Sequence, residues 1–187
     1  NREYDLSSIA NHTLSDVMND NSDNILIQGF LKKSWTRNNK VYNILKYDKD
    51  HLTYDMVDTI GLWRSVICSN KKINVFSPPK PLNSSIFMEK YNASECVAEE
   101  FIEGTMINLF YDQEANKWEI TSKTSVGCDV SFFRDQPMFS ELFGDVCEHL
   151  ELDVSKFSKE YCYNFVLQHP KNKFVLSVSE KKLYLIA

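Results

Sequence analysis

The sequence predicts an α+β fold in which most strands pair antiparallel. Short runs rich in β-branched and aromatic residues follow one another, separated by turn-forming residues. One longer segment, residues 136–153, carries apolar residues at the three- and four-residue spacing of an amphipathic helix. The chain contains no internal repeat and no low-complexity linker. Together these features favour one mostly antiparallel domain with a few helices.

The first half of the chain is predicted to form consecutive hairpins. Residues 1–24 are polar and rich in turn formers, so we expect a polar N-terminal segment followed by a domain at residues 25–187. Strands are expected at 25–37 and 40–48, joined by "RNN". A short helical or turn segment leads into a strand within residues 53–70. The next strand ends at Pro78 and Pro79, because proline has no N–H to donate to a neighbouring strand.

The second half is predicted to combine strands with two helices. Residues 84–91 resemble a short helix, with Ser84 or Ser85 as its N-cap. The helix at 136–153 is the longer of the two. Antiparallel strands are expected at 95–101, 105–112, 117–123, 161–169 and 174–187.

Composition limits the classes of function. Apolar residues make up 43% of the chain, enough for a folded core. The formal charge of −5 gives no overall basic field, and we expect no DNA partner. The five cysteines lack the short spacing of metal ligands, so we expect free thiols, no metal site and a cytoplasmic location. No apolar run is long enough to span a membrane, and no membrane partner is expected.

Glu103 and Gly104 interrupt a strand-like run in the stretch "VAEEFIEGTMINLFYD". Glycine is rare inside strands, because it packs nothing and loses more backbone entropy than other residues. It occurs where a ligand or another backbone comes close. A carboxylate beside such a glycine favours a ligand pocket at this point.

Four stretches, in this order, resemble the adenylation domain of the bacteriophage-type RNA ligases, in a divergent form like that of a large DNA virus. The resemblance covers roughly residues 40–187. The matching stretches are residues 41–83, "EEFIEGTMINLFYD", "WEITSKTSVG" and "YNFVLQHPKNKFVLSVSEKKLYLIA". The resemblance implies a two-sheet nucleotidyltransferase core with the nucleotide bound between the sheets.

The family's functional positions can be carried over one at a time. Arg64 and Lys80 match basic residues of its early elements, and Lys123 matches the lysine of the strand after the nucleotidyl motif. Glu103 and Gly104 match the acidic-glycine pair of that motif. With the residue at the nucleophile position, the ligand-binding residues predicted in this way are Arg64, Lys80, Phe101, Glu103, Gly104 and Lys123.

Two positions depart from the family pattern. Phe101 stands where the family has its nucleophilic lysine, and Val166 stands where it has a glutamate that serves the ribose. Covalent adenylation needs a lysine amine to attack the α-phosphorus, and phenylalanine cannot do this. No catalytic residue is therefore predicted. The resemblance instead implies a non-catalytic domain that binds an ATP- or GTP-type nucleotide or an RNA 5′ end.

The predicted residues suit that role chemically. Phe101 can stack on a base, an interaction worth ~1–3 kcal/mol, and Glu103 can accept hydrogen bonds from the Watson–Crick edge of guanine. The basic residues can hold phosphates through charge-assisted hydrogen bonds. An mRNA cap, with its positively charged methylated guanine, is the sharpest form of this hypothesis.

Plainer interpretations stay open at each position. Phe101 can be a core residue, Glu103 and Gly104 a bulge, and Arg64 part of a structural ion pair, while Lys80 and Lys123 can be solvated. Two other functions also stay open. One is an active RNA ligase or nucleotidyltransferase with its nucleophile elsewhere, which would use a divalent metal. The other is a scaffold of the same fold that binds a protein partner.

Overall fold

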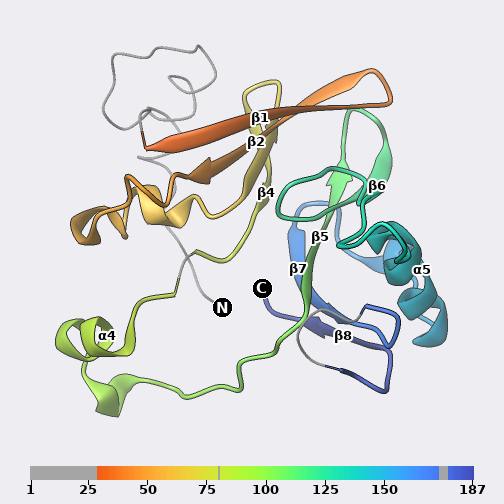
Figure 1. The fold of residues 1–187 in the computed structure, drawn as a ribbon. Coiled ribbons are helices and arrows are strands. Elements are labelled where there is room, and N and C mark those ends of the chain that lie inside the picture. The colour runs from red at the N-terminus through yellow and green to blue at the C-terminus, as the bar shows by residue number, and fades with distance from the viewer. Residues whose placement is uncertain (1–28, 80, 173–176) are drawn as a thin grey trace.

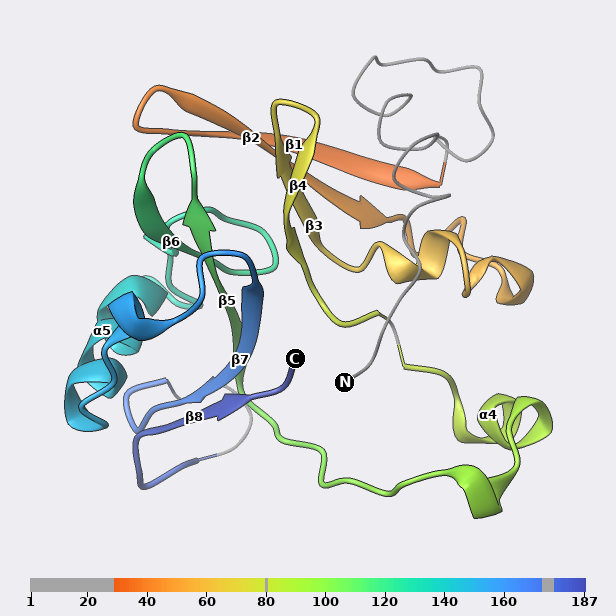
Figure 2. The same cartoon turned by 180° about the vertical axis from the view of Figure 1, so that it is seen from behind.

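Two four-stranded antiparallel sheets form the body of the protein and face each other across a shared core (Figure 1, Figure 2). The structure is a computed structural model that describes residues 29–79, 81–172 and 177–187. The expected α+β class and the antiparallel pairing are confirmed. The polar segment predicted at residues 1–24 lies outside the described residues.

The first sheet is a series of neighbours in chain order: β1 (Phe30–Arg37), β2 (Lys40–Tyr47), β3 (Val66–Ser69) and β4 (Lys72–Phe76). Its tight turns, at Asn38-Asn39 and Asn70-Lys71, place both residues at positive φ, between 49° and 61°. Such turns match the right-handed twist of the paired strands. The hairpin predicted around "RNN" is thereby confirmed. The short helical segment predicted before the next strand is present as η2 (Tyr54–Met56) and η3 (Ile60–Leu62), and the strand that follows begins only at Val66.

The second sheet has the order β6 (Lys117–Thr121), β5 (Thr105–Asp112), β7 (Cys162–Gln168) and β8 (Lys182–Leu185). Helix α5 (Phe139–His149) covers its outer face, as the helical spacing predicts, and η5 (Val154–Lys156) follows it. Burial of apolar side chains between helix and sheet is the main source of stability here. The buried residues of this core include Ile107, Leu109, Leu142, Phe143, Val146, Phe165 and Leu167.

The strand predicted at 95–101 is wrong. After β4 the chain forms α4 (Ser84–Lys90) and η4 (Ala93–Glu95) and then runs without regular structure to β5. Both edges of β5 are already paired, with β6 and with β7, so residues 95–101 find no edge beside it. The cap predicted for the short helix is also wrong: Asn83, rather than Ser84 or Ser85, accepts a hydrogen bond from the Ser85 N–H at 3.1 Å.

Candidate functional site

The polarity of the side chains changes along the faces that the two sheets turn toward each other. At one end this interface is apolar, and Ile44, Ile67 and Val75 of the first sheet pack with Phe110 of the second. Side chains alternate between faces along a strand, so positions two residues further along each strand face the same way. In the direction away from the apolar end these inward positions are Lys46, Ser65, Ser77, Asn108, Thr121 and Asn164, and Lys123 follows just after the end of β6. The interface therefore passes from apolar to polar to basic.

The polar layer is buried and joins the two sheets. Ser77 Oγ donates to Asn108 Oδ1 at 3.5 Å, and Asn108 Nδ2 donates to Thr121 Oγ1 at 3.1 Å. Ser65 Oγ donates to the carbonyl oxygen of Lys123 at 3.1 Å, which holds the loop after β6 against the first sheet. Asn164 Oδ1 is buried in the same layer and has no hydrogen-bond partner within the described part of the chain. Such orphaned buried polar atoms are uncommon in folded proteins.

A basic pocket lies beyond the polar layer. We define the basic pocket by its lining residues, which are Tyr47, Lys49, Arg64, Pro81 and Lys123, and it has a volume of about 400 Å³. The first four belong to the first sheet and its connections, and Lys123 follows β6 of the second sheet. The pocket is therefore built from both halves of the molecule, and its cations are carried by chain segments far apart in sequence.

The electrostatics of the basic pocket favour an anion. Partial burial lowers the pKa of Lys123, and the positive charges of Arg64, Lys49 and Lys46 lower it further. None of these four side chains forms an ion pair with a carboxylate among the residues that the structure describes. Cations gathered without counter-charges repel one another, and a bound anion removes that repulsion.

The structure brings two of the six predicted ligand-binding residues together. Arg64 and Lys123, matched to motifs about sixty residues apart, line the same pocket. Arg64 is half-buried and makes no ion pair with a described carboxylate, so its alternative as part of a structural ion pair is not supported. Lys80 lies outside the described residues, although its neighbour Pro81 lines the pocket.

Phe101 does not line the basic pocket. Its side chain is 85% exposed on the irregular segment before β5, so the alternative that made it a core residue is wrong. Glu103 is half-buried on the same segment, and its carbonyl oxygen accepts a hydrogen bond from Gln168 Nε2 at 2.7 Å. The arrangement does not place Phe101 or Glu103 beside Arg64 and Lys123 as joint lining of one pocket.

Gly104 lies directly against a neighbouring strand. Its φ is +157°, and a Cβ built there would lie 2.6 Å from the Leu167 carbonyl oxygen and 2.7 Å from Val166 Cγ1. The glycine therefore lets β5 begin against the backbone of β7. The close approach that the sequence predicts at this glycine is present, and the group that approaches is protein backbone.

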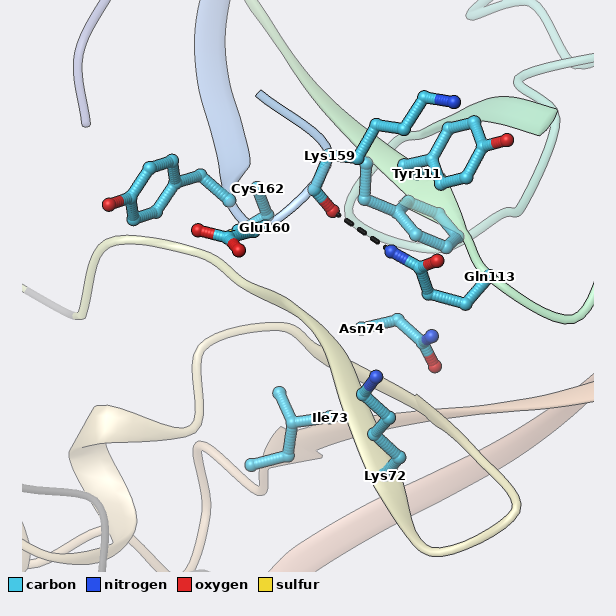
Figure 3. A pocket seen from close by; sticks show the side chains of 10 residues that line it. Lys72, Ile73, Asn74, Tyr111, Gln113, Lys159, Glu160 and Cys162 are labelled. Carbon is cyan, nitrogen blue, oxygen red and sulfur yellow. Dashed lines mark hydrogen bonds between the residues drawn. The ribbon is translucent and has the colours of Figure 1, made fainter. Parts of the chain in front are cut away.

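A second hollow lies near the apolar end of the interface, between β4, β5 and the loop before β7 (Figure 3). Its volume is about 320 Å³. Its charged groups are mixed in sign, with Lys72 and Lys159 near Glu160. Lys159 lies 4.1 Å from the centroid of the Tyr111 ring, and its carbonyl oxygen accepts a hydrogen bond from Gln113 Nε2 at 3.3 Å. This hollow is less suited to an anion than the basic pocket, because Glu160 opposes a second negative charge.

Sequence reasoning missed Lys46, Lys49 and the polar layer. Lys46 could have been found from strand alternation, because it follows Ile44 on the same face of β2. Lys49 and Asn164 gave no signal, because a lysine in a turn and an asparagine in a strand have many ordinary roles.

The described residues contain no group of three His, Cys, Asp or Glu side chains arranged to hold a metal ion. Among the helices in the described ranges, none is long and apolar enough to cross a membrane. No protein-family model matches the sequence, and no curated protein shows significant similarity to it.

Proposed function

We propose that this chain binds a phosphate group of a nucleotide or of an RNA 5′ end in the basic pocket, without catalysis by the ligase-type nucleophile. The observation that carries the proposal is the convergence of Lys49, Arg64 and Lys123 in one pocket, close enough to Lys46 for its charge to act on Lys123, with no ion pair to a carboxylate among the described residues. Arginine offers paired N–H donors to phosphate oxygens, and the lysines add flexible charge.

The surroundings of the pocket fit a nucleotide better than a free inorganic anion. Tyr47 and Pro81 give the pocket apolar walls next to its cations. Behind it, Ser65 of the polar layer donates to the Lys123 carbonyl oxygen and so fixes the loop that carries this cation. A ligand with both a charged and an apolar part uses both kinds of surface.

A thermal-shift panel tests the proposal. The ligands are ATP, GTP, a methylated cap analogue, a short 5′-phosphorylated RNA and the same RNA without its phosphate. A ligand at 100 times its Kd adds about 2.7 kcal/mol of stability, or roughly 5–10 °C in Tm for a domain of this size. We expect at least one phosphorylated ligand to raise Tm, and the unphosphorylated RNA to have a smaller effect.

Two variants make the panel specific. Lys123→Met removes one charge from the pocket, whereas Lys156→Met removes an equal charge from an exposed position on η5. The shift should fall in the first variant and persist in the second. No shift with any phosphorylated ligand would reject nucleotide binding and favour the protein-scaffold alternative. A preference for the cap analogue would support the cap form of the proposal.

A second candidate is a nucleotidyltransferase that uses Lys123 as its nucleophile. The supporting observation is the lowered pKa of Lys123 beside three other cations, which increases the fraction of neutral amine. The amine would attack the α-phosphorus, forming a P–N bond as pyrophosphate leaves and the amine proton passes to solvent. Incubation with α-labelled ATP or GTP and a divalent metal should then label the wild type and not Lys123→Met. Absence of label in the wild type would reject this candidate.

A further inference from the structure

The connection between β4 and β5 carries a segment that is exposed over most of its length and meets β7 at its end, where Gln168 donates to the Glu103 carbonyl oxygen. We call residues 92–103 the acidic strap. It includes η4 (Ala93–Glu95) and continues without regular structure to β5, and residues 92–101 are all exposed. Both views show it running apart from the two sheets, between α4 and β5 (Figure 1, Figure 2). Long connections that do not pack on their own domain are commonly functional.

Two apolar side chains stand out on the strap. Val97 is 86% exposed and Phe101 is 85% exposed, which makes them the most exposed of the large apolar side chains in the described ranges. A lone exposed apolar residue is ordinary, whereas apolar surface gathered in one place marks contact sites, and these two residues lie four positions apart on one exposed segment. Aromatic side chains are also the residues that most often anchor protein interfaces.

The charge of the acidic strap indicates which kind of surface it can bind. It contains four glutamates and no basic residue. A nucleic acid is therefore repelled, and a surface that accepts the strap needs cations beside apolar walls. The basic pocket has this character, because Lys49, Arg64 and Lys123 lie there beside Tyr47 and Pro81.

We infer that the acidic strap of one copy docks in the basic pocket of a second copy, with Phe101 against the apolar walls and Glu100 among the cations. The contact joins two different surfaces, so it is head-to-tail and can continue from copy to copy. It does not require the pocket to bind a nucleotide. It does require that a phosphorylated ligand and the strap compete, because both occupy the same cations.

Sedimentation equilibrium of the full chain over a concentration series tests the inference. The protein is kept reduced, because Cys96 on the strap is exposed and a disulfide between copies would imitate association. At low salt we expect the weight-average mass of the wild type to rise above 21.8 kDa with concentration. Raising the salt concentration should weaken the association, because the contact is between opposite charges.

Three variants separate the strap from other surfaces. Phe101→Ser, which removes the apolar side chain without adding charge, and Lys123→Met should each shift self-association to at least tenfold higher concentration. Leu150→Ser changes an apolar residue that is 45% exposed at the end of α5, and it should associate as the wild type does. A wild type that stays monomeric up to about 1 mM, or association that Phe101→Ser leaves unchanged, would overturn the inference. Closure of the strap on its own pocket would also appear as a monomer.

The outcome is distinguishable from that of the proposed function. Phe101→Ser should lose self-association and keep the Tm shift with phosphorylated ligands, whereas Lys123→Met should lose both. Self-association without any ligand shift would reject nucleotide binding and keep this inference. A Tm shift with a phosphorylated ligand, in a protein that stays monomeric, would support nucleotide binding and overturn this inference.

Discussion

Lys40 Nζ lies 2.8 Å from each carboxylate oxygen of Asp112, and this contact joins the start of β2 to the end of β5. Asp112 is fully buried. It also accepts hydrogen bonds from the Tyr42 hydroxyl and from the backbone N–H groups of Glu114 and Ala115. One carboxylate thus connects the two sheets and holds the turn between β5 and β6.

Asp112→Asn is expected to destabilise the fold. The substitution removes the buried charge that Lys40 and Tyr42 face, and it leaves Lys40 with the exposed Glu114 as its remaining ion-pair partner. Breaking a buried ion pair on one side costs about 3–5 kcal/mol. Urea denaturation should show a lower midpoint with an unchanged m-value. Asp153→Asn, which changes an exposed carboxylate beside η5, should cost less than about 1 kcal/mol and is the matched control.

Stability at acid pH should depend on the same carboxylate. Although burial alone opposes ionisation, the hydrogen bonds from Lys40 and Tyr42 lower the pKa of Asp112 to about 2, from 3.8. A carboxylate with a lowered pKa stabilises the fold above its unfolded pKa, and this stability is lost as pH falls through the folded pKa. The shift corresponds to about 2 kcal/mol. The stability difference between wild type and Asp112→Asn should therefore shrink between pH 4 and 2, and a difference that stays constant would contradict the assignment.

Gly104→Ala is expected to destabilise the start of β5 by about 1–3 kcal/mol, as overpacking of a closely packed site does. The added Cβ would meet the Leu167 carbonyl oxygen, and alanine rarely adopts the positive φ found there. Gly144 offers a matched control, because it lies in α5 with nothing within 4 Å of a built Cβ. Gly144→Ala should stabilise by up to about 1 kcal/mol. Equal effects of the two changes on Tm would show that backbone contact at Gly104 is unimportant.

Lys123→Met should change how stability depends on alkaline pH. The pKa of Lys123 is lowered in the folded chain, so the unfolded chain binds more protons between the folded pKa and the ordinary value of 10.5. The lysine therefore makes stability rise with pH across that interval. Denaturation midpoints measured from pH 8 to 10.5 should show this rise in the wild type relative to Lys123→Met. The wild type is compared with Lys123→Met because the raised pKa of Tyr42 changes the alkaline stability of both proteins. Lys156→Met, which removes a different charge, should keep the slope of the wild type.

The hairpins and α5 were predictable because their signals are local. "RNN" encodes a turn in which Asn38 and Asn39 adopt positive φ, and the apolar spacing of α5 matches the face that it buries. That residues 95–101 form no strand was not predictable from the local pattern, because this outcome depends on both edges of β5 being occupied. Arg64 and Lys123 could be selected from motif order, but their meeting with Lys46 and Lys49 depends on how the two sheets pack.

The basic pocket has a mechanical consequence. Its cations are divided between the sheets, with Lys49 and Arg64 on one side and Lys123 on the other. Their mutual repulsion opposes the cohesion of the two sheets at this end, whereas the Ser65 and Ser77 hydrogen bonds favour it. An anion bound between the cations would remove that repulsion. Occupancy of the pocket and cohesion of the two sheets are therefore thermodynamically coupled.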